Sequence, residues 1–558
     1  MRIHTLLLVI FATATGFSQN KVLIISGGGS PAGNHYSQYL QTKTLFDHVA
    51  GQSPGKVDVY FGAGNRSGES PVLADVHRQL NASDGVREVM LPGFIDGNQS
   101  ASKQNVLNYF DGNAARELGA NDTFFLFVSD HGMPNQTADG TSHLEDNCID
   151  LWGFNADLTT GQMQNANFEN RCLSKNELKL QLEQKINAKQ TVFAMSQCYS
   201  GGFHQMSVVE KAGYPSANPK VCGFTAITED TTASGCTPDV DGPGYQGYER
   251  YFTQQLTGLD VVSGKKLRNA KKSIQEAHRA ATLEDFTKDI PLATSDYYLL
   301  QWAQRIENSR NPRTNVITAQ QAKEIYTRDS LVGENYQTDV AYRSKSAFFS
   351  RMQDEVIKAH PTLQASLTGS LDGLRAAELL AKNQENRDQQ SIGQIAQTAQ
   401  QYTNAIISGW NQFVLSGKSQ LDPAEIELET RLFGAYDRQY GPGAGDQVSL
   451  YIMSIKSVVE PALSENISRY KAGRFNYALN WALAQPNLQQ AAVRLKEMNA
   501  RIEQLVAIAV ASQKKHGLVR RMLLYRKALG SWNALVQMND QEALNDLRGL
   551  LDCELASM

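Results

Sequence analysis

The sequence predicts an α/β domain with a doubly wound, mostly parallel sheet, followed by an all-α helical domain. In the first half of the 558 residues, short and nearly continuous apolar runs alternate with amphipathic helical patterns. Such runs are typical of strands buried on both faces, and their alternation with helices indicates parallel strands joined by helical crossovers. From about residue 318 the strand-like runs fade, and Gln, Ala, Leu, Glu and Lys dominate.

Five apolar runs are the expected strands of the sheet, and each ends in glycine or polar residues. They cover residues 22–25, 57–61, 124–128, 192–195 and 221–227. In a parallel sheet of this kind, ligand sites form beyond the carboxyl ends of the strands. The residues that directly follow the runs are therefore the first candidates for a functional site.

Helical signals lie between these runs and in the second half. Ser102 precedes apolar residues at helical spacing, and Ser174 with Glu177 forms a capping box ahead of another helix. One long amphipathic helix is indicated by apolar residues at three- and four-residue steps, namely Leu495, Met498, Ile502, Leu505 and Ile508. A stripe of this kind is more often packed in a core than exposed as a groove for a partner.

The N-terminus has the features of an export signal. Arg2 and His4 precede an apolar run over residues 6–12, which is too short to span a bilayer, and small residues lead to Ser18. The alternative is a buried first strand or helix, but a better strand starts at residue 22. We expect a signal peptide at 1–18 and a secreted or periplasmic protein. No later apolar run reaches about 20 residues, so no transmembrane helix is expected.

The remaining chain is too long for one ordinary domain. We assign residues 19–300 to the α/β domain and residues 301–330, where Asn, Arg and Gln are frequent, to a linker. Residues 331–558 are the expected helical domain. Net charge is −4 and the isoelectric point is about 6.2, so the chain lacks the basic footprint of a nucleic-acid-binding protein.

Disulfides are permitted in an exported protein, and the chain has six cysteines. Cys148 and Cys172 bracket one polar insertion, and Cys222 and Cys236 bracket another, so we expect these two pairs to be bonded. Cys198 stands between the pairs as a free thiol. The pattern leaves Cys553, near the C-terminus, without an assigned role.

Cys198 and His131 are the candidate catalytic pair. Each follows an apolar run of the expected sheet, and each is followed by glycine, which lets a substrate backbone approach closely. A thiol is only slightly ionised at neutral pH, but a nearby imidazole favours the thiolate and can later protonate a leaving amine. A cysteine or a histidine alone in such a position is usually a core or turn residue. Their occurrence together at neighbouring strand ends indicates nucleophilic catalysis.

The same segments resemble those of the legumain family of asparaginyl endopeptidases and of the related caspase-like peptidases. Residues 128–132 read Val-Ser-Asp-His-Gly, and residues 196–202 read Ser-Gln-Cys-Tyr-Ser-Gly-Gly, which is similar to the Cys-x-Ser-Gly element of these enzymes. The resemblance covers about residues 20–300. It implies a caspase-like fold and a cysteine endopeptidase that hydrolyses peptide bonds of protein or peptide substrates through a thioester. By this resemblance Cys198 attacks, His131 transfers the proton, and the backbone N–H groups of Gly132 and Cys198 bind the oxyanion.

The specificity pocket departs from the legumain pattern. The position two residues before the nucleophile is acidic in legumains and is Ser196 here, and their Arg-His pair is matched only by Asn34 and His35. Downstream, Thr228 ends a segment that resembles the strand lining the pocket, and Asp239 would stand at its acidic position. His35 and Asp239 are equally well explained as loop residues. An asparaginyl specificity is therefore one alternative among several.

Two other patterns suggest cofactors only weakly. The glycine cluster at 27–33 follows the first expected strand, but its spacing does not fit a dinucleotide-binding loop. Asp239, Asp241 and Glu249 are acidic, but they lack the spacing of a calcium-binding loop. We expect no metal in the chemistry and no cofactor.

Two questions stay open at the level of the sequence. The α/β domain could be a catalytically silent, caspase-like binding scaffold instead of an enzyme. The helical half could pack on its own catalytic domain and mask the active site, as the prodomain of legumains does, or it could be a substrate-binding appendage. Masking predicts that a chain ending near residue 305 is more active than the full-length protein.

Overall fold

The structure is a computed structural model of the chain. It describes residues 20–29, 34–52, 57–64, 74–81, 84–90, 97–112, 117–137, 140–157, 162–165, 167–236, 245–308, 316–328, 339–415 and 481–557. The expected signal peptide at 1–18 and the pocket candidate Asp239 lie outside the described residues. So do parts of the expected linker and of the helical region.

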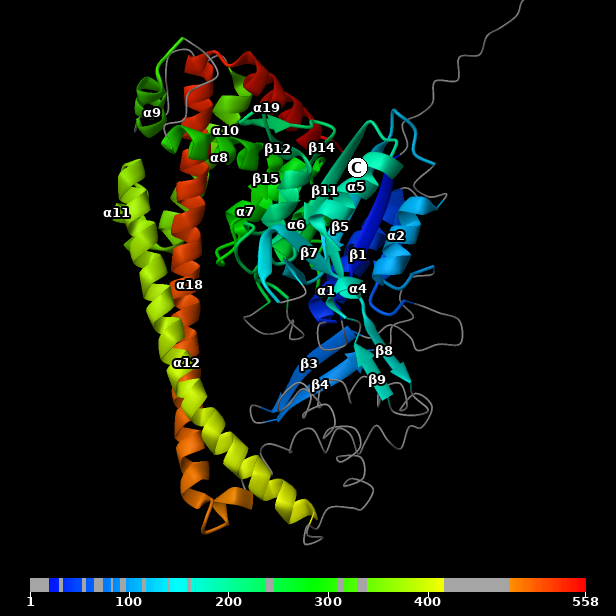
Figure 1. The fold of residues 1–558 in the computed structure, drawn as a ribbon, viewed down its shortest axis with the longest axis vertical. Coiled ribbons are helices and arrows are strands. Elements are labelled where there is room, and N and C mark those ends of the chain that lie inside the picture. The colour runs from blue at the N-terminus through cyan, green and yellow to red at the C-terminus, as the bar shows by residue number, and fades with distance from the viewer. Residues whose placement is uncertain are drawn as a thin grey trace, which may run out of the picture.

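A mostly parallel sheet forms the centre of the N-terminal half (Figure 1). Within the described residues it has six strands in the order β15-β14-β11-β5-β1-β2. Five of them are parallel and correspond to the five expected runs, and β15 is antiparallel to β14. The strands are β1 (Asn20–Ser26), β2 (Val57–Phe61), β5 (Thr123–Ser129), β11 (Gln190–Met195), β14 (Val221–Thr225) and β15 (Leu292–Ala293). The expectation of a mostly parallel sheet is therefore confirmed.

Helices cover both faces of this sheet. Alternate residues of each strand point to opposite sides, so apolar strands present two apolar faces that helices can bury. On one face Leu23, Leu126 and Phe193 pack with α2 (Lys103–Asp111) and α5 (Lys175–Lys185). On the other, Ile24 and Phe127 pack with helices including α1 (Tyr36–Gln52), α6 (Tyr248–Thr257) and α7 (Ile274–Glu284). The expected capping box of Ser174 and Glu177 starts α5.

Several antiparallel pairs surround the central sheet. A second sheet joins β6 (Gly132–Gln136), β7 (Ser142–Asp150) and β10 (Cys172–Ser174). β6 and most of β7 are polar and β10 has only three residues, so the apolar-run criterion did not reveal them. Further two-stranded pairs are β12 (Val208–Lys211) with β13 (Tyr214–Ala217), β3 (Ala74–Asn81) with β4 (Asp84–Met90), and β8 (Phe154–Asp157) with β9 (Gln162–Asn165). The short helix α4 (Phe168–Arg171) leads into β10.

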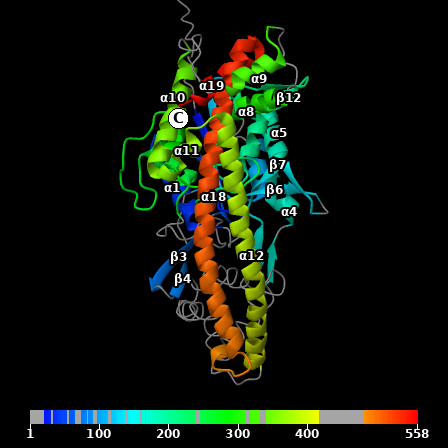
Figure 2. The same ribbon diagram turned by 90° about the vertical axis from the view of Figure 1, so that its left-hand side faces the viewer.

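The C-terminal half is helical, as expected, and is dominated by two long helices. They lie side by side in both views and run antiparallel, since Glu378 and Glu385 of α12 contact His516 of α18 while Ala399 and Ile406 pack with Ala492 and Leu495 (Figures 1 and 2). The helices are α8 (Thr294–Glu307), α9 (Ala319–Thr327), α10 (Val340–Ala359), α11 (Gln364–Leu367), α12 (Leu371–Leu415), α18 (Gln489–Met538) and α19 (Gln541–Glu554). Along the described ranges, no helix combines the length and apolar character that a membrane span requires.

The C-terminal helices share one core with the helices on one face of the sheet. Met522, Trp532 and Leu550 are buried in the same cluster as Phe224 of β14 and Phe252 of α6. Polar contacts join the same elements. The buried carboxylate of Glu554 accepts hydrogen bonds from the backbone N–H (2.7 Å) and the hydroxyl (2.9 Å) of Ser295. The last helices therefore contribute to the interior of the α/β unit.

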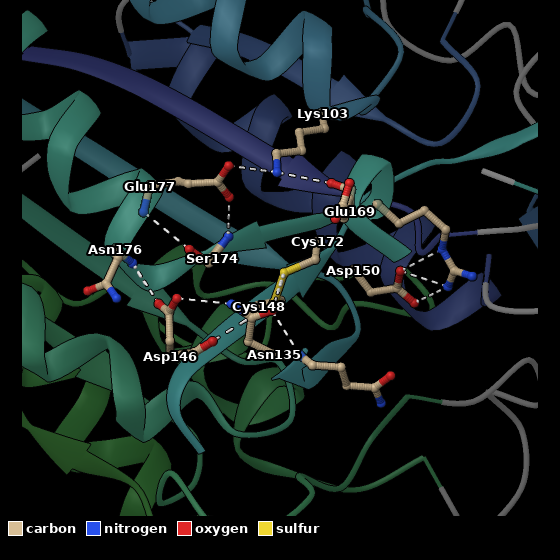
Figure 3. Close-up of a disulfide and its surroundings, with 12 residues drawn as sticks. Lys103, Asn135, Asp146, Cys148, Asp150, Glu169, Cys172, Ser174, Asn176 and Glu177 are labelled. Carbon is tan, nitrogen blue, oxygen red and sulfur yellow. Dashed lines mark hydrogen bonds and ion pairs between the residues drawn. A yellow bond between two sulfur atoms is a disulfide. The ribbon is translucent and has the colours of Figure 1, made fainter. Parts of the chain in front are cut away.

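Two disulfides are formed, and one of the expected pairings is wrong. Cys148 and Cys172 join β7 to β10, which is the pair expected from the sequence (Figure 3). Cys222 is bonded to Cys553 of α19, not to Cys236. The reason is direction: Cys222 lies near the start of β14 and points to the face that α19 covers, whereas Cys236 follows the carboxyl end of that strand. Cys198 and Cys236 remain free thiols.

Candidate active site

His131 and Cys198 lie level with each other at the carboxyl edge of the sheet. In the parallel register of β5 and β11, Val128 pairs with Met195, and His131 and Cys198 each follow three residues later. The strand order reverses between β1 and β5, because β2 pairs on one side of β1 and β5 on the other. The crevice at such a reversal is the usual ligand site of open α/β sheets. His131 follows β5, which borders this reversal, and Cys198 follows β11, the next strand of the sheet.

The segments of the two candidate residues touch through their backbones. Gly132 lies so close to Cys198 that a Cβ atom at residue 132 would collide with the Cys198 carbonyl oxygen and lie 2.9 Å from the carbonyl carbon. A side chain at this position would push the two segments apart. Glycine after His131 is therefore required for the close approach of the two loops.

Asp130 ties the histidine segment to the glycine cluster after β1. Its buried carboxylate accepts hydrogen bonds from the backbone N–H groups of Gly28 (2.8 Å) and His131 (2.6 Å). Burial and the nearby carboxylate of Asp150 raise the pKa of Asp130 well above its usual range, although these two hydrogen bonds oppose the shift. The glycine cluster thus supports the His131 loop.

The turn that carries Cys198 has a strained backbone and is held in place by hydrogen bonds from a neighbouring strand. Tyr199 has a φ of 59°, in the left-handed region that non-glycine residues seldom adopt, and it precedes the short helix η1 (Ser200–Met206). The buried Asn147 side chain of β7 donates to the carbonyl oxygens of Tyr199 (3.1 Å) and Glu229 (3.0 Å). Strained backbone of this kind clusters at functional sites, where the surrounding structure holds it in place.

The Cys198 thiol is partly exposed, and its electrostatic surroundings are mixed. Burial raises the pKa of Cys198, and the carboxylate of Asp289 adds to this. The nearby backbone N–H of Ala233, the ammonium of Lys288 and the backbone N–H of Cys198 itself lower it. A thiolate at this position would therefore be favoured by two backbone N–H groups and one cation, against the cost of burial.

The expected pocket residues are distributed around this edge. The ring of His35 packs edge-on against that of His131, with 4.9 Å between ring centroids. Ser196 is buried, and its hydroxyl donates to the carbonyl oxygen of Val128 (3.1 Å). Thr228 is buried and donates to Asp230 (2.6 Å). The structure thus brings His35 to the candidate residue His131, while Ser196 bonds the neighbouring strand β5 and Thr228 bonds Asp230.

A buried carboxylate lies beside the two strand ends, at a residue whose sequence pattern suggested only a weak calcium ligand. Glu249 of α6 accepts a hydrogen bond from Ser129. Burial raises the pKa of Glu249, and the side chains of Ser129, Ser196 and Gln41 oppose the shift. The cluster borders a cavity of about 30 Å³ next to β5 and β11. Among the described residues, no ion pair involves Glu249.

Sequence reasoning missed the residues that hold the site from outside the two motifs. Asn147 and Asp289 lie in polar segments without a recognisable spacing. Asp130 stood inside the Asp-His-Gly motif and could have been singled out. Nor did the sequence indicate that Cys236 lies near Cys198, close enough for the charge of one thiolate to raise the pKa of the other.

In the described ranges, no group of three or more His, Cys, Asp or Glu side chains is arranged to hold a metal ion. Neither a scan against protein-family models nor a search of curated proteins finds a match for this chain.

Proposed function

We propose that the chain is a cysteine endopeptidase of the legumain or caspase-like kind, with Cys198 as nucleophile and His131 as proton carrier. The observation that carries the proposal is the level position of these residues at the carboxyl edge of neighbouring parallel strands, with Gly132 against the Cys198 backbone. The resemblance of residues 128–132 and 196–202 to the motifs of those families supports it. So does the mostly parallel sheet, which we propose to be of the caspase-like type.

The proposed reaction needs four proton transfers, all through His131, two in each half of the cycle. His131 accepts the Cys198 proton, and the thiolate attacks the carbonyl carbon of the scissile amide. The backbone N–H groups of Gly132 and Cys198 stabilise the oxyanion. His131 then protonates the leaving amine, which departs and leaves a thioester. His131 then deprotonates a water molecule, which attacks the thioester. The Cys198 thiolate leaves and takes the proton back from His131, which releases the acid and restores the free thiol.

The test uses the two free cysteines as a matched pair. The variant C198A should abolish peptide cleavage that thiol reagents inhibit, and H131A should reduce it by about a hundredfold or more. The variant C236A, which removes the other free thiol, should retain cleavage. A peptide library identifies the substrate before these variants are compared. Cleavage that survives in C198A would exclude Cys198 as the nucleophile.

The rival function is a catalytically silent scaffold, and one observation favours it. Burial raises the pKa of Cys198, which by itself makes a less reactive thiol. An electrophilic peptide probe separates the two functions, because an enzyme should label at Cys198 much faster than at Cys236. Equal labelling of both thiols, with no cleavage from the library, would favour the scaffold.

We also propose export from the cytoplasm. The two disulfides are typical of oxidising compartments, and they agree with the expected signal peptide. A mature N-terminus near residue 19 in protein purified from the producing cells would support this proposal.

A further inference from the structure

The loop Thr231–Ser234 lies between the nucleophile segment and the backbone of Lys288 and Asp289. Its four residues interact alternately with the two sides. On one side, the carbonyl of Thr231 accepts from the Tyr199 N–H (2.9 Å), and the Ala233 N–H is near enough to the Cys198 sulfur to lower the pKa of the thiol. On the other side, the Thr232 hydroxyl accepts from Lys288 Nζ (2.8 Å), and the Ser234 N–H donates to Asp289 Oδ1 (2.7 Å). The loop is therefore a bridge from Cys198 to residues 288–289.

Asp289 fixes more than this loop. Its second carboxylate oxygen accepts the N–H of Tyr248 (2.9 Å), the first residue of α6. A carboxylate at this position caps the helix and interacts favourably with its dipole. The same α6 presents Glu249 to Ser129 below the catalytic edge. One buried side chain thus orders both the loop at the thiol and the helix under the site.

Helix α18, from the far end of the chain, holds residues 288–289. Arg521 is fully buried, and its Nε donates to the Asp289 carbonyl (2.9 Å). Its guanidinium also donates to the backbone (2.6 Å) and carboxylate (3.2 Å) of Asp285. One helical turn earlier, Gly517 packs directly on Lys288. A Cβ atom at Gly517 would lie 2.5 Å from the Cα atom and 2.7 Å from the carbonyl carbon of Lys288.

We infer that α18 is part of the active site, and that Asp289 is the positioning residue through which it holds the Cys198 thiol. Gly517 and Arg521 fix Lys288 and Asp289, these two residues fix the loop 231–234, and the loop presents the Ala233 N–H to the sulfur. Only the expected effect of α18 on catalysis rests on the proposed function. The effect of α18 on the reactivity of the Cys198 thiol can be measured whether or not the protein is a peptidase.

The decisive variant is G517A in the full-length protein. An added methyl group displaces Lys288 and Asp289 from α18, which withdraws the Ala233 N–H and the Lys288 ammonium from the sulfur. The rate at which iodoacetamide alkylates Cys198 at neutral pH, measured by mass spectrometry, should fall by about tenfold. The kcat of peptide cleavage should fall by about the same factor, with little change in KM. The control is G393A in α12, where a methyl group meets no atom within 4 Å. Its rates should match those of the wild type.

The variant D289N tests the positioning residue itself. It keeps the shape of the side chain but leaves one of the two N–H groups, of Ser234 or Tyr248, without an acceptor. Burial and Asp285 raise the pKa of Asp289 to about 7. Ionised Asp289 raises the pKa of Cys198, so wild-type alkylation should fall below that of D289N progressively as the pH rises through about 7, after the two profiles are scaled at pH 5. A purely structural role would change the alkylation rate by the same factor at every pH.

The outcomes separate the inference from the proposed function. If G517A is folded and Cys198 reacts as fast as in G393A, or faster, the loop does not support the thiol and the inference is wrong. If G517A does not fold, T232V decides, because it removes only the exposed acceptor of Lys288. Slower alkylation in T232V supports the inference, and an unchanged rate overturns it. If wild-type protein cleaves no peptide but G517A still slows alkylation, the proposed function fails and the inference stands.

Discussion

Cys222 on strand β14 of the central sheet and Cys553 on helix α19 are joined by a disulfide between residues 331 positions apart in the sequence. The bond ties the end of the chain to the sheet that carries the candidate active site. Around it, Leu547 and Leu550 of α19 are buried in the same core as Phe224 of β14. The tertiary contact and the covalent bond therefore act on the same interface.

Removal of this disulfide should destabilise the protein substantially. A cross-link over a long loop restricts the unfolded chain, which contributes about 2–5 kcal/mol to the free energy of unfolding. The double variant C222S/C553S should lose an amount of this order in urea denaturation under oxidising conditions. The variant C236S, which removes a free thiol, is the control and should change stability far less. Equal stability of the double variant and C236S would show that the bond contributes nothing.

A chain that ends near residue 305 should fail to fold, in contrast to the gain of activity that masking predicts. Such a truncation removes Met522, Trp532 and Leu550 from the shared core, and it removes the buried Arg521 from Asp285. Loss of one partner of a buried ion pair alone costs about 3–5 kcal/mol. Circular dichroism and size-exclusion chromatography of the purified fragment test this. A folded, more active fragment would instead favour the masking hypothesis.

Because of Glu554, the free energy of unfolding should fall as the pH rises from about 4 to about 7. Burial raises the pKa of Glu554 to about 7, although Lys345 and the Ser295 N–H oppose the shift. The unfolded value is about 4.3, so between the two values the folded state holds a proton that the unfolded state has released. Ionisation of Glu554 therefore lowers the free energy of unfolding by its full amount above about pH 7 and has no effect on it below about pH 4.

The variant E554Q removes this penalty. Its melting temperature should exceed that of the wild type at pH 8, and the difference should shrink towards pH 4. The control is E542Q, an exposed carboxylate on the same helix. A difference between E554Q and wild type that is the same at both pH values would contradict the assignment of the titration to Glu554.

Substitution of Gly132 should separate the segments that carry the two candidate catalytic residues. The variant G132A places a methyl group against the Cys198 carbonyl, so residues 131–132 and 198 must move apart. Misplacement of reacting groups by about 1 Å can cost about a hundredfold in rate, and we expect a loss of this order in kcat. The matched variant G51A adds a methyl group in open space on α1. It should keep wild-type activity.

The fold was predictable where one local pattern carried the signal. The apolar runs identified the five parallel strands, and Ser174 with Glu177 identified the start of α5. The polar strands β6 and β7 were not predictable, because their pairing depends on tertiary contacts and not on burial of both faces. The pairing of Cys222 was wrongly predicted for the same reason. Proximity in the sequence favoured Cys236, but the direction of the Cys222 side chain on β14 selected α19.

The sequence by itself determined the chemistry of the candidate site: a cysteine and a histidine that each follow an expected strand and are each followed by glycine. The tertiary structure decided how that candidate site is held. Asn147, Asp289 and Arg521 are far from Cys198 in the sequence, and no spacing connects them to it. Asn147 donates to the carbonyl of Tyr199 and Asp289 accepts from the N–H of Ser234, through contacts that only the folded chain makes. Arg521 reaches the backbone of Asp289 only once α18 has packed on the sheet domain. Local patterns encode strands and motifs, whereas long-range packing determines which side chains support them.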